Sequence, residues 1–139
     1  MSDSGHVQIG DVAERTGLSL RTIRWYEEVG LVPPSARTSG GFRLYTDSDI
    51  ERLELVKRMK PLDFTLEEMR HLLETVDQLD DPATPAPERS TLGERLAMYR
   101  ELADSRVEAL RTQLANAELF AQSLAGRGSA RGGARRRTQ

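Results

Sequence analysis

The sequence lacks cysteine altogether among its 139 residues. This absence excludes disulfide bridges, thiolate metal sites, cysteine nucleophiles and thiol redox switches. The chain also lacks a basic start followed by an apolar run, and no window approaches eighteen apolar residues. These two absences argue against a signal peptide and a membrane span. We therefore expect a soluble protein that works in the cytoplasm, away from membranes.

The chain also lacks the overall positive charge of many nucleic-acid binders, because its formal net charge is -2. The charge is unevenly distributed, however. Residues 15–60 hold nine Lys or Arg against six Asp or Glu, and the last fourteen residues hold five Arg and no acid. Because clustered Lys and Arg supply affinity for phosphate, these two basic segments leave nucleic-acid binding open.

Proline, glycine and apolar residues divide the chain into five predicted segments. Residues 1–6 form a flexible N-terminal arm, and residues 7–78 form a compact unit. Three prolines in residues 79–91 indicate a linker, because they interrupt both helices and strands. Residues 92–125 read as one long helix. The Gly/Arg tail of residues 126–139 is too poor in apolar residues to order, so we expect it to be disordered.

Four helices are predicted in the compact unit from their caps and stops. Gly17 ends the first helix, and Ser19 offers its hydroxyl to cap the second. Thr46 caps the third, and Thr65 with Glu68 forms a capping box for the fourth. Between the second and third helices, residues 31–45 contain a Pro-Pro break and two short strands around a Ser-Gly-Gly turn. The order is helix, helix, hairpin, helix, helix, and the fold is mainly α.

The long helix carries a narrow apolar stripe with spacings of four and three, which is typical of a coiled coil with one stutter. A single isolated helix cannot bury this stripe, so we expect a second copy of the chain to cover it. Alternatively, the helix folds back on the compact unit. The predicted dimerisation residues are Leu96, Tyr99, Ala103, Val107, Leu110, Leu114, Ala117 and Leu124.

A helix-turn-helix is indicated by Ala13, Gly17 and Ile23, which are spaced four and then six residues apart. Such a motif needs a small residue where its helices cross, a turn residue with positive φ and an apolar anchor. Periodicity leaves five residues of the second helix mainly on its outer face: Arg21, Thr22, Arg24, Trp25 and Glu28. In a major groove, Arg pairs with guanine and apolar atoms meet thymine methyl groups, so this helix is a candidate DNA reader.

An alternative interpretation gives the same residues a structural role. Arg21 and Arg24 would then pair with Glu28 and Glu27 on the same helix, and Trp25 would fill a small core. The hairpin favours the DNA interpretation, because Arg37 and Arg43 flank its Ser-Gly-Gly turn and could lay a wing along phosphates.

The run VQIGDVAERTGLSLRTIRWYEEVGLVPPSARTSGGFRLYTDSDIERL, followed by DFTLEEMRHLL, resembles the MerR family of bacterial transcription regulators. The shared features are the TIR-aromatic-Tyr-Glu block, the Gly-Leu-x-x-Pro break and the Gly-aromatic-Arg-x-Tyr wing. The resemblance implies a winged-helix homodimer, joined by an antiparallel coiled coil and bound to a near-palindromic element of double-stranded promoter DNA. Relatives often activate transcription by distorting an overlong promoter spacer, which makes RNA polymerase a further expected partner.

The family's DNA-contacting positions fall on residues of the second helix, the wing and the end of the third helix. They are Arg21, Thr22, Arg24 and Trp25; Arg37, Arg43 and Tyr45; and Lys57, Arg58 and Lys60, which are candidates for a second wing. The matching positions that we assign mostly to packing are Tyr26, Leu31, Phe42 and Leu44.

Departures from the family pattern qualify the resemblance. Trp25 stands where Tyr, Phe or His is commoner, and its indole has only one N–H to donate. Asp63 replaces a usual Gly, although Asp tolerates the left-handed conformation. Metal-sensing relatives place cysteines at both ends of the dimerisation helix, and drug-sensing ones carry an effector domain after it. This sequence has neither, so we expect a regulator without a conventional ligand-binding domain.

Metal, cofactor and enzyme functions find no support in the residue pattern. His6 and His71 are the only histidines, and no set of ligands stands at a useful spacing. No nucleophile with a base and no phosphate-cradling loop is visible either. The remaining competitor is a helical interaction module that binds a partner protein through its coiled coil, but such a module has no need of the basic residues on the second helix and wing.

Overall fold

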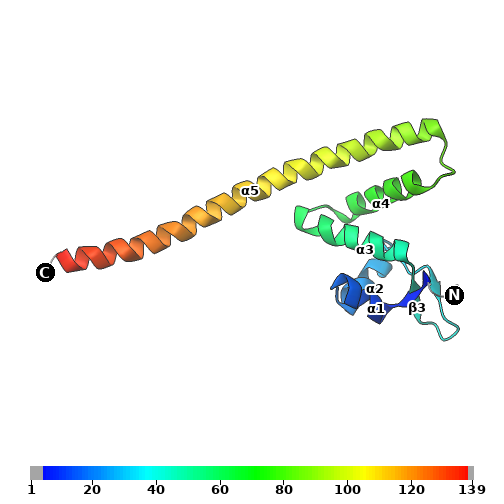
Figure 1. Cartoon of the computed structure of the whole chain (residues 1–139), viewed down its shortest axis with the longest axis horizontal. Helices are drawn as coiled ribbons and strands as arrows, with labels where there is room; N and C mark the ends of the chain where they lie inside the picture. The colour runs from blue at the N-terminus through cyan, green and yellow to red at the C-terminus, as the bar shows by residue number, and fades with distance from the viewer. Residues whose placement is uncertain (1–4, 138–139) are drawn as a thin grey trace. The chain divides into compact units, whose positions relative to one another are not determined.

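The structure is a computed structural model. It describes the backbone of residues 5–137 and the side chains of residues 5–128. The first four residues of the predicted arm, and residues 138–139, lie outside the described residues. The chain divides into two compact units, Met1–Tyr99 and Arg100–Gln139. In the first unit, α1, α2 and β3 lie close to one another beside α3 (Figure 1).

The first unit begins with a short strand and two helices, β1 (Val7–Gln8), α1 (Ile9–Thr16) and α2 (Leu20–Glu28). Helix α1 ends at Gly17, whose φ is 76° and whose amide donates to the Ala13 carbonyl at 2.8 Å. Ser19 caps α2, because its hydroxyl accepts a hydrogen bond from the Thr22 amide at 3.1 Å. Both predicted helix boundaries are confirmed, and so is the helix-turn-helix.

The wing consists of β2 (Ala36–Arg37) and β3 (Arg43–Tyr45), which pair antiparallel with Arg37 opposite Arg43. The sequence did not predict β1, which adds a third strand on the other edge of β3, with Val7 opposite Tyr45. The sheet order is β1-β3-β2. The added strand joins the start of the chain to the base of the wing and so places the wing beside α1.

Two further helices follow the wing, α3 (Asp47–Met59) and α4 (Leu66–Asp80), with the 3-10 turn η2 (Lys60–Leu62) between them. Thr46 and Thr65 cap these helices through complete capping boxes with Asp49 and Glu68. Asp63 adopts a φ of 60° in the turn between them. The predicted caps and the predicted left-handed aspartate are therefore confirmed.

The core of this unit lies where α1, α2 and β3 meet α3, and a second layer packs between α3 and α4 (Figure 1). Burying each large apolar side chain in such a core contributes roughly 1.5–3 kcal/mol relative to leaving it exposed. The aliphatic and aromatic side chains that are fully covered are Val12, Ile23, Tyr26, Val32, Tyr45, Leu53 and Val56. This core fixes the outer face of α2 and the wing relative to each other.

The predicted linker of residues 79–91 is shorter than expected. Helix α4 continues to Asp80, and α5 (Ala86–Arg137) begins six residues before the predicted start at residue 92. Pro87 lies in the first turn of α5, where an absent amide proton leaves no helical hydrogen bond unmade. Only residues 81–85 connect the two helices, so a proline-rich composition here marks a helix start as well as a turn.

Arg89 holds this connection together from the first turns of α5. Its guanidinium donates to the carbonyls of Leu79, Asp81 and Thr84, at 2.9, 2.5 and 3.1 Å. These carbonyls lie at the end of α4 and in the turn after it. Carbonyls in these positions have no amide donor within a helix. The connection is therefore an ordered turn.

Helix α5 also passes through the predicted disordered tail. The backbone of residues 126–137 is helical in the structure, where the composition of the tail predicts disorder. Glycine disfavours a helix, but Ala and Arg favour it, and extending an existing helix needs no new nucleation.

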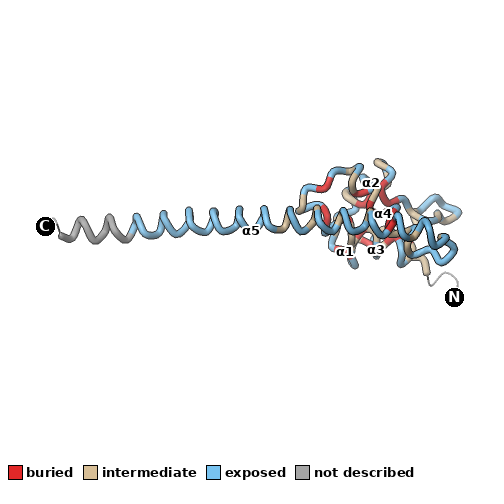
Figure 2. Tube along the Cα trace, turned by 90° about the horizontal axis from the view of Figure 1, so that it is seen from above, coloured by how far each residue is buried: buried red, intermediate tan, exposed pale blue. Residues whose placement is uncertain are grey.

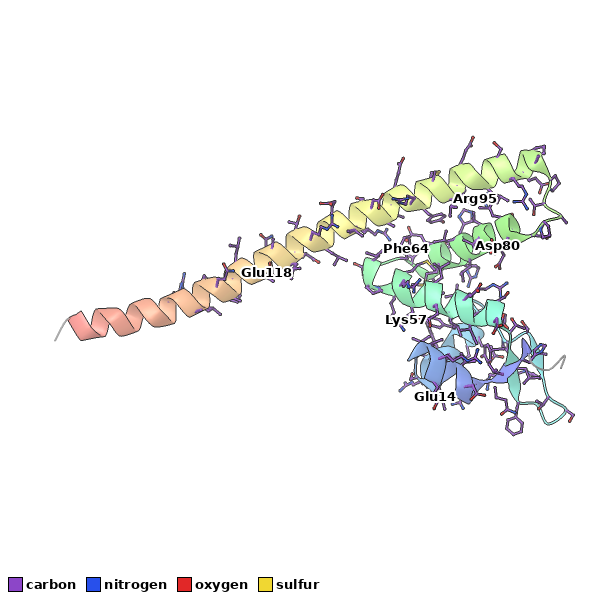
Figure 3. All side chains as sticks on the ribbon, viewed as in Figure 1. Glu14, Lys57, Phe64, Asp80, Arg95 and Glu118 are labelled. Carbon is purple, nitrogen blue, oxygen red and sulfur yellow. The ribbon has the colours of Figure 1, made fainter. Side chains whose placement is uncertain are left out.

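The first turns of α5, up to Tyr99, pack inside the first unit. Leu92 is buried, the Tyr99 hydroxyl lies 2.7 Å from Nδ1 of His71, and its ring centroid lies 6.3 Å from that of Phe64, which Figure 3 labels. Tyr99 covers part of the His71 ring, which is half-buried. Tyr99, predicted as a dimerisation residue, contacts its own subunit, so the fold-back alternative holds for this part of the helix.

The other predicted dimerisation residues are differently exposed. Ala103 and Val107 are half-buried, whereas Leu96, Leu110, Leu114, Ala117 and Leu124 are exposed. Beyond residue 107 every described side chain of α5 is exposed (Figure 2). Within the described residues, no helix combines the length and the apolar character needed to cross a bilayer.

Candidate nucleic-acid interface

The outer face of α2 presents the polar and aromatic side chains that the sequence assigned to it. Ile23 and Tyr26 turn inward, so Arg21, Arg24 and Trp25 remain exposed. The Trp25 indole is 42% exposed even though its ring contacts that of Tyr26, with centroids 5.4 Å apart. This exposure contradicts the alternative in which Trp25 fills the core.

Arg21 and Arg24 are not engaged by the acids of their own helix. In the part of the chain whose side chains are described, neither arginine forms an ion pair or a side-chain hydrogen bond. Thr22 is half-buried, and its hydroxyl accepts a hydrogen bond of 2.9 Å from the Ser19 hydroxyl. The two guanidinium groups therefore keep all their donors for an external partner.

A single surface hollow gathers these side chains. Its lining consists of Arg21, Thr22, Arg24, Trp25, Glu28 and Lys60. Lys60 comes from η2, which follows α3, and the fold brings it to the outer face of α2. Three cationic groups and one aromatic ring on one concave surface form a suitable site for a phosphate backbone and base edges.

The wing arginines are placed differently from the prediction. Arg37 donates through Nη2, and Arg43 through Nε, to the two carboxylate oxygens of Glu27 on α2. The hydrogen bond to Glu27 is the main cause that raises the pKa of Arg43 above its ordinary value, and burial opposes it. The sequence pattern indicated Glu27 only as a partner for Arg24, because no local spacing joins α2 to the wing.

Tyr45, which the resemblance placed among the DNA contacts, is completely buried. It follows Arg43 by two residues in β3 and therefore shares the strand face that turns toward α2. Burial is the main cause that raises the pKa of its phenol, and the nearby Glu27 carboxylate also raises it. We correct the prediction: Tyr45 is a core residue.

Phe42 shows the opposite error. We assigned it to packing, but it is 64% exposed. It lies in the wing turn beyond the last cross-strand pair, Arg37 with Arg43, directly after Gly41 with its φ of 88°. Phe42 therefore belongs to the exposed tip of the wing.

The three basic residues at the end of α3 separate in space. Lys57, labelled in Figure 3, donates to the carbonyl of Thr16 at 2.6 Å and lies 3.7 Å from Glu54, so it caps the end of α1. Arg58 lines a different hollow, between α3 and α4. Lys60 alone reaches the hollow on α2. Lys57 thus has a contact within its own domain, and the second wing of Lys57, Arg58 and Lys60 stays a prediction.

Metal binding finds no support in the geometry. Among the residues whose side chains are described, no group of three or more His, Asp or Glu side chains could hold a metal ion. The described site therefore consists of cationic, hydroxyl and aromatic groups on one face of a helix-turn-helix, with a wing attached to that helix through Glu27.

Comparison with known proteins gives the family. The family model described as "MerR HTH family regulatory protein" matches residues 7–76. A second family model, described as "MerR, DNA binding", matches residues 50–126. The chain is 51% identical over 75 residues to the HTH-type transcriptional regulator YfmP of Bacillus subtilis, a match that covers 53% of this chain and 54% of that protein. It is 44% identical over 71 residues to the mercuric resistance operon regulatory protein of Bacillus cereus, covering 51% and 54%. The chain thus spans about half the length of the curated relatives that it matches.

Solved structures share the fold over most of the chain. A MerR family transcriptional regulator from Bacillus thuringiensis has a TM-score of 0.67 at 21% identity, covering 86% of this chain and 97% of that one. HiNmlR, a MerR family regulator lacking the sensor domain and bound to promoter DNA, has a TM-score of 0.64 at 26% identity, covering 86% and 88%.

Fold and site define a winged helix-turn-helix regulator with a long C-terminal helix. The chain belongs to the MerR family of DNA-binding transcriptional regulators. The predicted family, fold class and function class are confirmed, and so is the prediction of a regulator rather than an enzyme.

Proposed function

We propose that this protein binds promoter DNA as a homodimer and regulates transcription there. Each subunit would place α2 in a major groove, where Arg21, Thr22, Arg24 and Trp25 meet base edges and phosphates. The observation that carries the proposal is the free state of Arg21 and Arg24 in the described structure, in one hollow with Trp25 and Lys60. The likeness to HiNmlR, which was crystallised on promoter DNA, supports it.

The wing would contact the phosphates that flank the groove, with Arg37 and Arg43 as its cationic groups. Lys60 would add a phosphate contact beside α2. We also propose that the arginines of residues 126–139 add sequence-independent affinity that salt weakens. We further propose that the bound dimer distorts the promoter spacer, so that RNA polymerase can engage the promoter. This function places the protein in the cytoplasm.

Dimerisation would use the exposed apolar residues of α5, in an antiparallel coiled coil. Leu110, Leu114 and Leu124 are exposed large apolar side chains on one stripe, and a second copy of the same stripe is the simplest cover for them. Leu96, Ala103, Val107 and Ala117 extend the stripe. Tyr99 is left out of this interface, because it packs against His71 and Phe64.

One binding experiment tests the DNA part of the proposal. The affinity of the full chain for random-sequence duplex DNA is measured by fluorescence anisotropy at a series of salt concentrations. We expect the affinity to fall steeply with salt, by about tenfold or more between roughly 50 and 200 mM. Absence of binding even at low salt would reject the proposal and favour the interaction module.

Sedimentation of the full chain tests the dimer. The double variant Leu110→Glu with Leu114→Glu should sediment as a monomer, because it places charges in the stripe. Thr112→Glu is the matched control, since it adds a charge on the same turns of α5 but on the opposite face. A double variant that remains dimeric would reject the coiled-coil interface.

A further inference from the structure

Glu27 joins three elements through one carboxylate. It stands on α2, and its two oxygens accept hydrogen bonds from Arg37 on β2 and from Arg43 on β3. The side chain of Glu27 is 20% exposed and that of Arg43 is 28% exposed. Such partly shielded, charge-assisted contacts are stronger than an exposed surface pair, because solvent screens them less.

The carboxylate also removes a repulsion within the wing. Arg37 and Arg43 are direct cross-strand partners, and like charges in this position destabilise a strand pair. Glu27 lies between them as the compensating charge. Arg37 in turn donates through Nη1 to the carbonyl of Gly41 at 3.0 Å, so the same guanidinium holds the wing turn.

Glu27 does not consume the wing arginines. Arg43 uses only Nε for Glu27, and Arg37 uses Nη1 and Nη2 for Gly41 and Glu27. In the described structure, the Nη1 and Nη2 groups of Arg43 and the Nε group of Arg37 have no hydrogen-bond acceptor. These N–H groups remain available to phosphate oxygens while their side chains are held in place.

We propose that Glu27 is a positioning residue for DNA binding. It fixes the two wing arginines against the reading helix, so that wing and helix meet the duplex as one rigid surface. The inference rests on the proposed function. If Glu27 acted only through its charge, its removal would strengthen DNA binding, because a carboxylate repels a nearby phosphate backbone. If Glu27 positions the wing arginines, its removal should instead weaken DNA binding.

The test compares two full-length variants that make the same change on neighbouring helices. Glu27→Gln on α2 removes the charged clamp. Glu14→Gln on α1 removes an exposed carboxylate that lies outside the hollow of Arg21 and Arg24 and forms no ion pair within the described residues. Each is titrated with random-sequence duplex DNA at several salt concentrations. We expect Glu27→Gln to bind about tenfold more weakly, and the slope of log affinity against log salt to become shallower by about one to two. Glu14→Gln should bind as tightly as the wild type or more tightly.

A double-mutant cycle separates positioning from a general loss of structure. In the background of Arg37→Ala with Arg43→Ala, Glu27→Gln has no arginine left to release, so it should change the affinity less than about twofold. An equal loss in both backgrounds would overturn the inference, since Glu27 would then act through something other than the wing.

The remaining outcomes are equally decisive. Glu27→Gln binding as tightly as Glu14→Gln would overturn the inference and leave the proposed function intact. A wild-type chain that does not bind DNA would overturn both. If circular dichroism shows that Glu27→Gln is unfolded, Glu27→Asp replaces it, because this variant keeps the charge and shortens the reach by one methylene group. Binding by Glu27→Asp at the wild-type level would then overturn the inference.

Discussion

The guanidinium of Arg70 in α4 donates a hydrogen bond of 2.7 Å to the carbonyl of Val29, the residue that ends α2. Carbonyls at the end of a helix lack helical partners, and a cation there also interacts favourably with the helix dipole. The two residues are 41 positions apart in the chain. Helix α4 therefore supports the end of α2.

Replacement of Arg70 by alanine should lower the free energy of unfolding by about 0.5–1.5 kcal/mol, because the Val29 carbonyl loses its charged donor. Urea unfolding followed by circular dichroism measures this change. Arg58→Ala is the control, since Arg58 is also exposed and cationic but has no hydrogen-bond or ion-pair partner in the described part of the chain. Equal destabilisation by both substitutions would show that the contact with Val29 adds nothing.

The buried Tyr45 hydroxyl leads to a second prediction. This oxygen has no hydrogen-bond partner among the described residues, so Tyr45→Phe should leave the free energy of unfolding unchanged or raise it. Tyr45→Ala should lower it by roughly 3–5 kcal/mol, because it empties a large core position. DNA affinity of Tyr45→Phe should equal that of the wild type. A loss of affinity in a stable Tyr45→Phe would restore Tyr45 as a DNA contact.

The ionisation of Tyr45 provides a prediction about pH. Burial raises its pKa above the ordinary value of 10.0, so the folded state keeps the phenol proton at pH values where the unfolded state has lost it. The unfolded state then binds fewer protons, and stability must fall as the pH rises above about 10. Denaturant unfolding at alkaline pH should show a smaller decline in Tyr45→Phe than in the wild type. Equal declines would show that Tyr45 does not contribute.

Local features of the fold were predictable from the sequence, because the atoms involved lie within a few residues of one another. The Ser19, Thr46 and Thr65 caps and the left-handed Gly17 each depend on contacts within one helical turn. The face of α2 that carries Arg24 followed from helical periodicity alone. The exposed face of α2 was therefore predictable from the sequence.

The contacts that the sequence did not predict are those in which the partner of a residue lies on another element. Lys57 contacts Thr16, 41 residues away, and Glu27 contacts a wing arginine 16 residues away. The family resemblance assigned Tyr45 to DNA contact and Phe42 to packing from their positions in the motif alone. In the structure Tyr45 lies on the buried face of β3, whereas Phe42 lies exposed in the wing turn. Charge and aromatic character predict that a residue can bind DNA, but the tertiary fold decides whether its side chain is free to do so.

Two substitutions distinguish the two roles considered for α5, packing back on its own first unit and dimerisation through a coiled coil. Tyr99→Ala should lower the free energy of unfolding, by roughly 2–4 kcal/mol, because it removes the contacts with His71 and Phe64. It should leave the sedimentation of the folded protein unchanged, whereas Leu124→Glu should weaken the dimer with little effect on the first unit. Dissociation caused by Tyr99→Ala in a stably folded chain would return Tyr99 to the dimer interface.

Arg24 is the residue whose loss should most affect base recognition. Its guanidinium is exposed and free in the described structure, and a bidentate contact with guanine contributes about 1–3 kcal/mol of discrimination. Genomic fragments selected with the wild-type protein provide a cognate duplex for the measurement. Arg24→Ala should lower the ratio of cognate to random affinity by a factor of roughly 5–150. An unchanged ratio would assign Arg24 to phosphate contact alone.

Lys60 and Arg58 offer a matched comparison, because both are exposed cations near the end of α3 but face different hollows. Lys60 lies with Arg21 and Arg24, so Lys60→Ala should weaken binding to cognate and random duplexes alike and reduce the salt slope by about one. Arg58 lies with the acidic residues Asp77 and Asp80, whose charges disfavour a nearby phosphate backbone. Arg58→Ala should therefore leave the salt slope unchanged. The reverse result, with the slope reduced only by loss of Arg58, would place the phosphate contacts on the α3–α4 side and require a different docking of the domain on DNA.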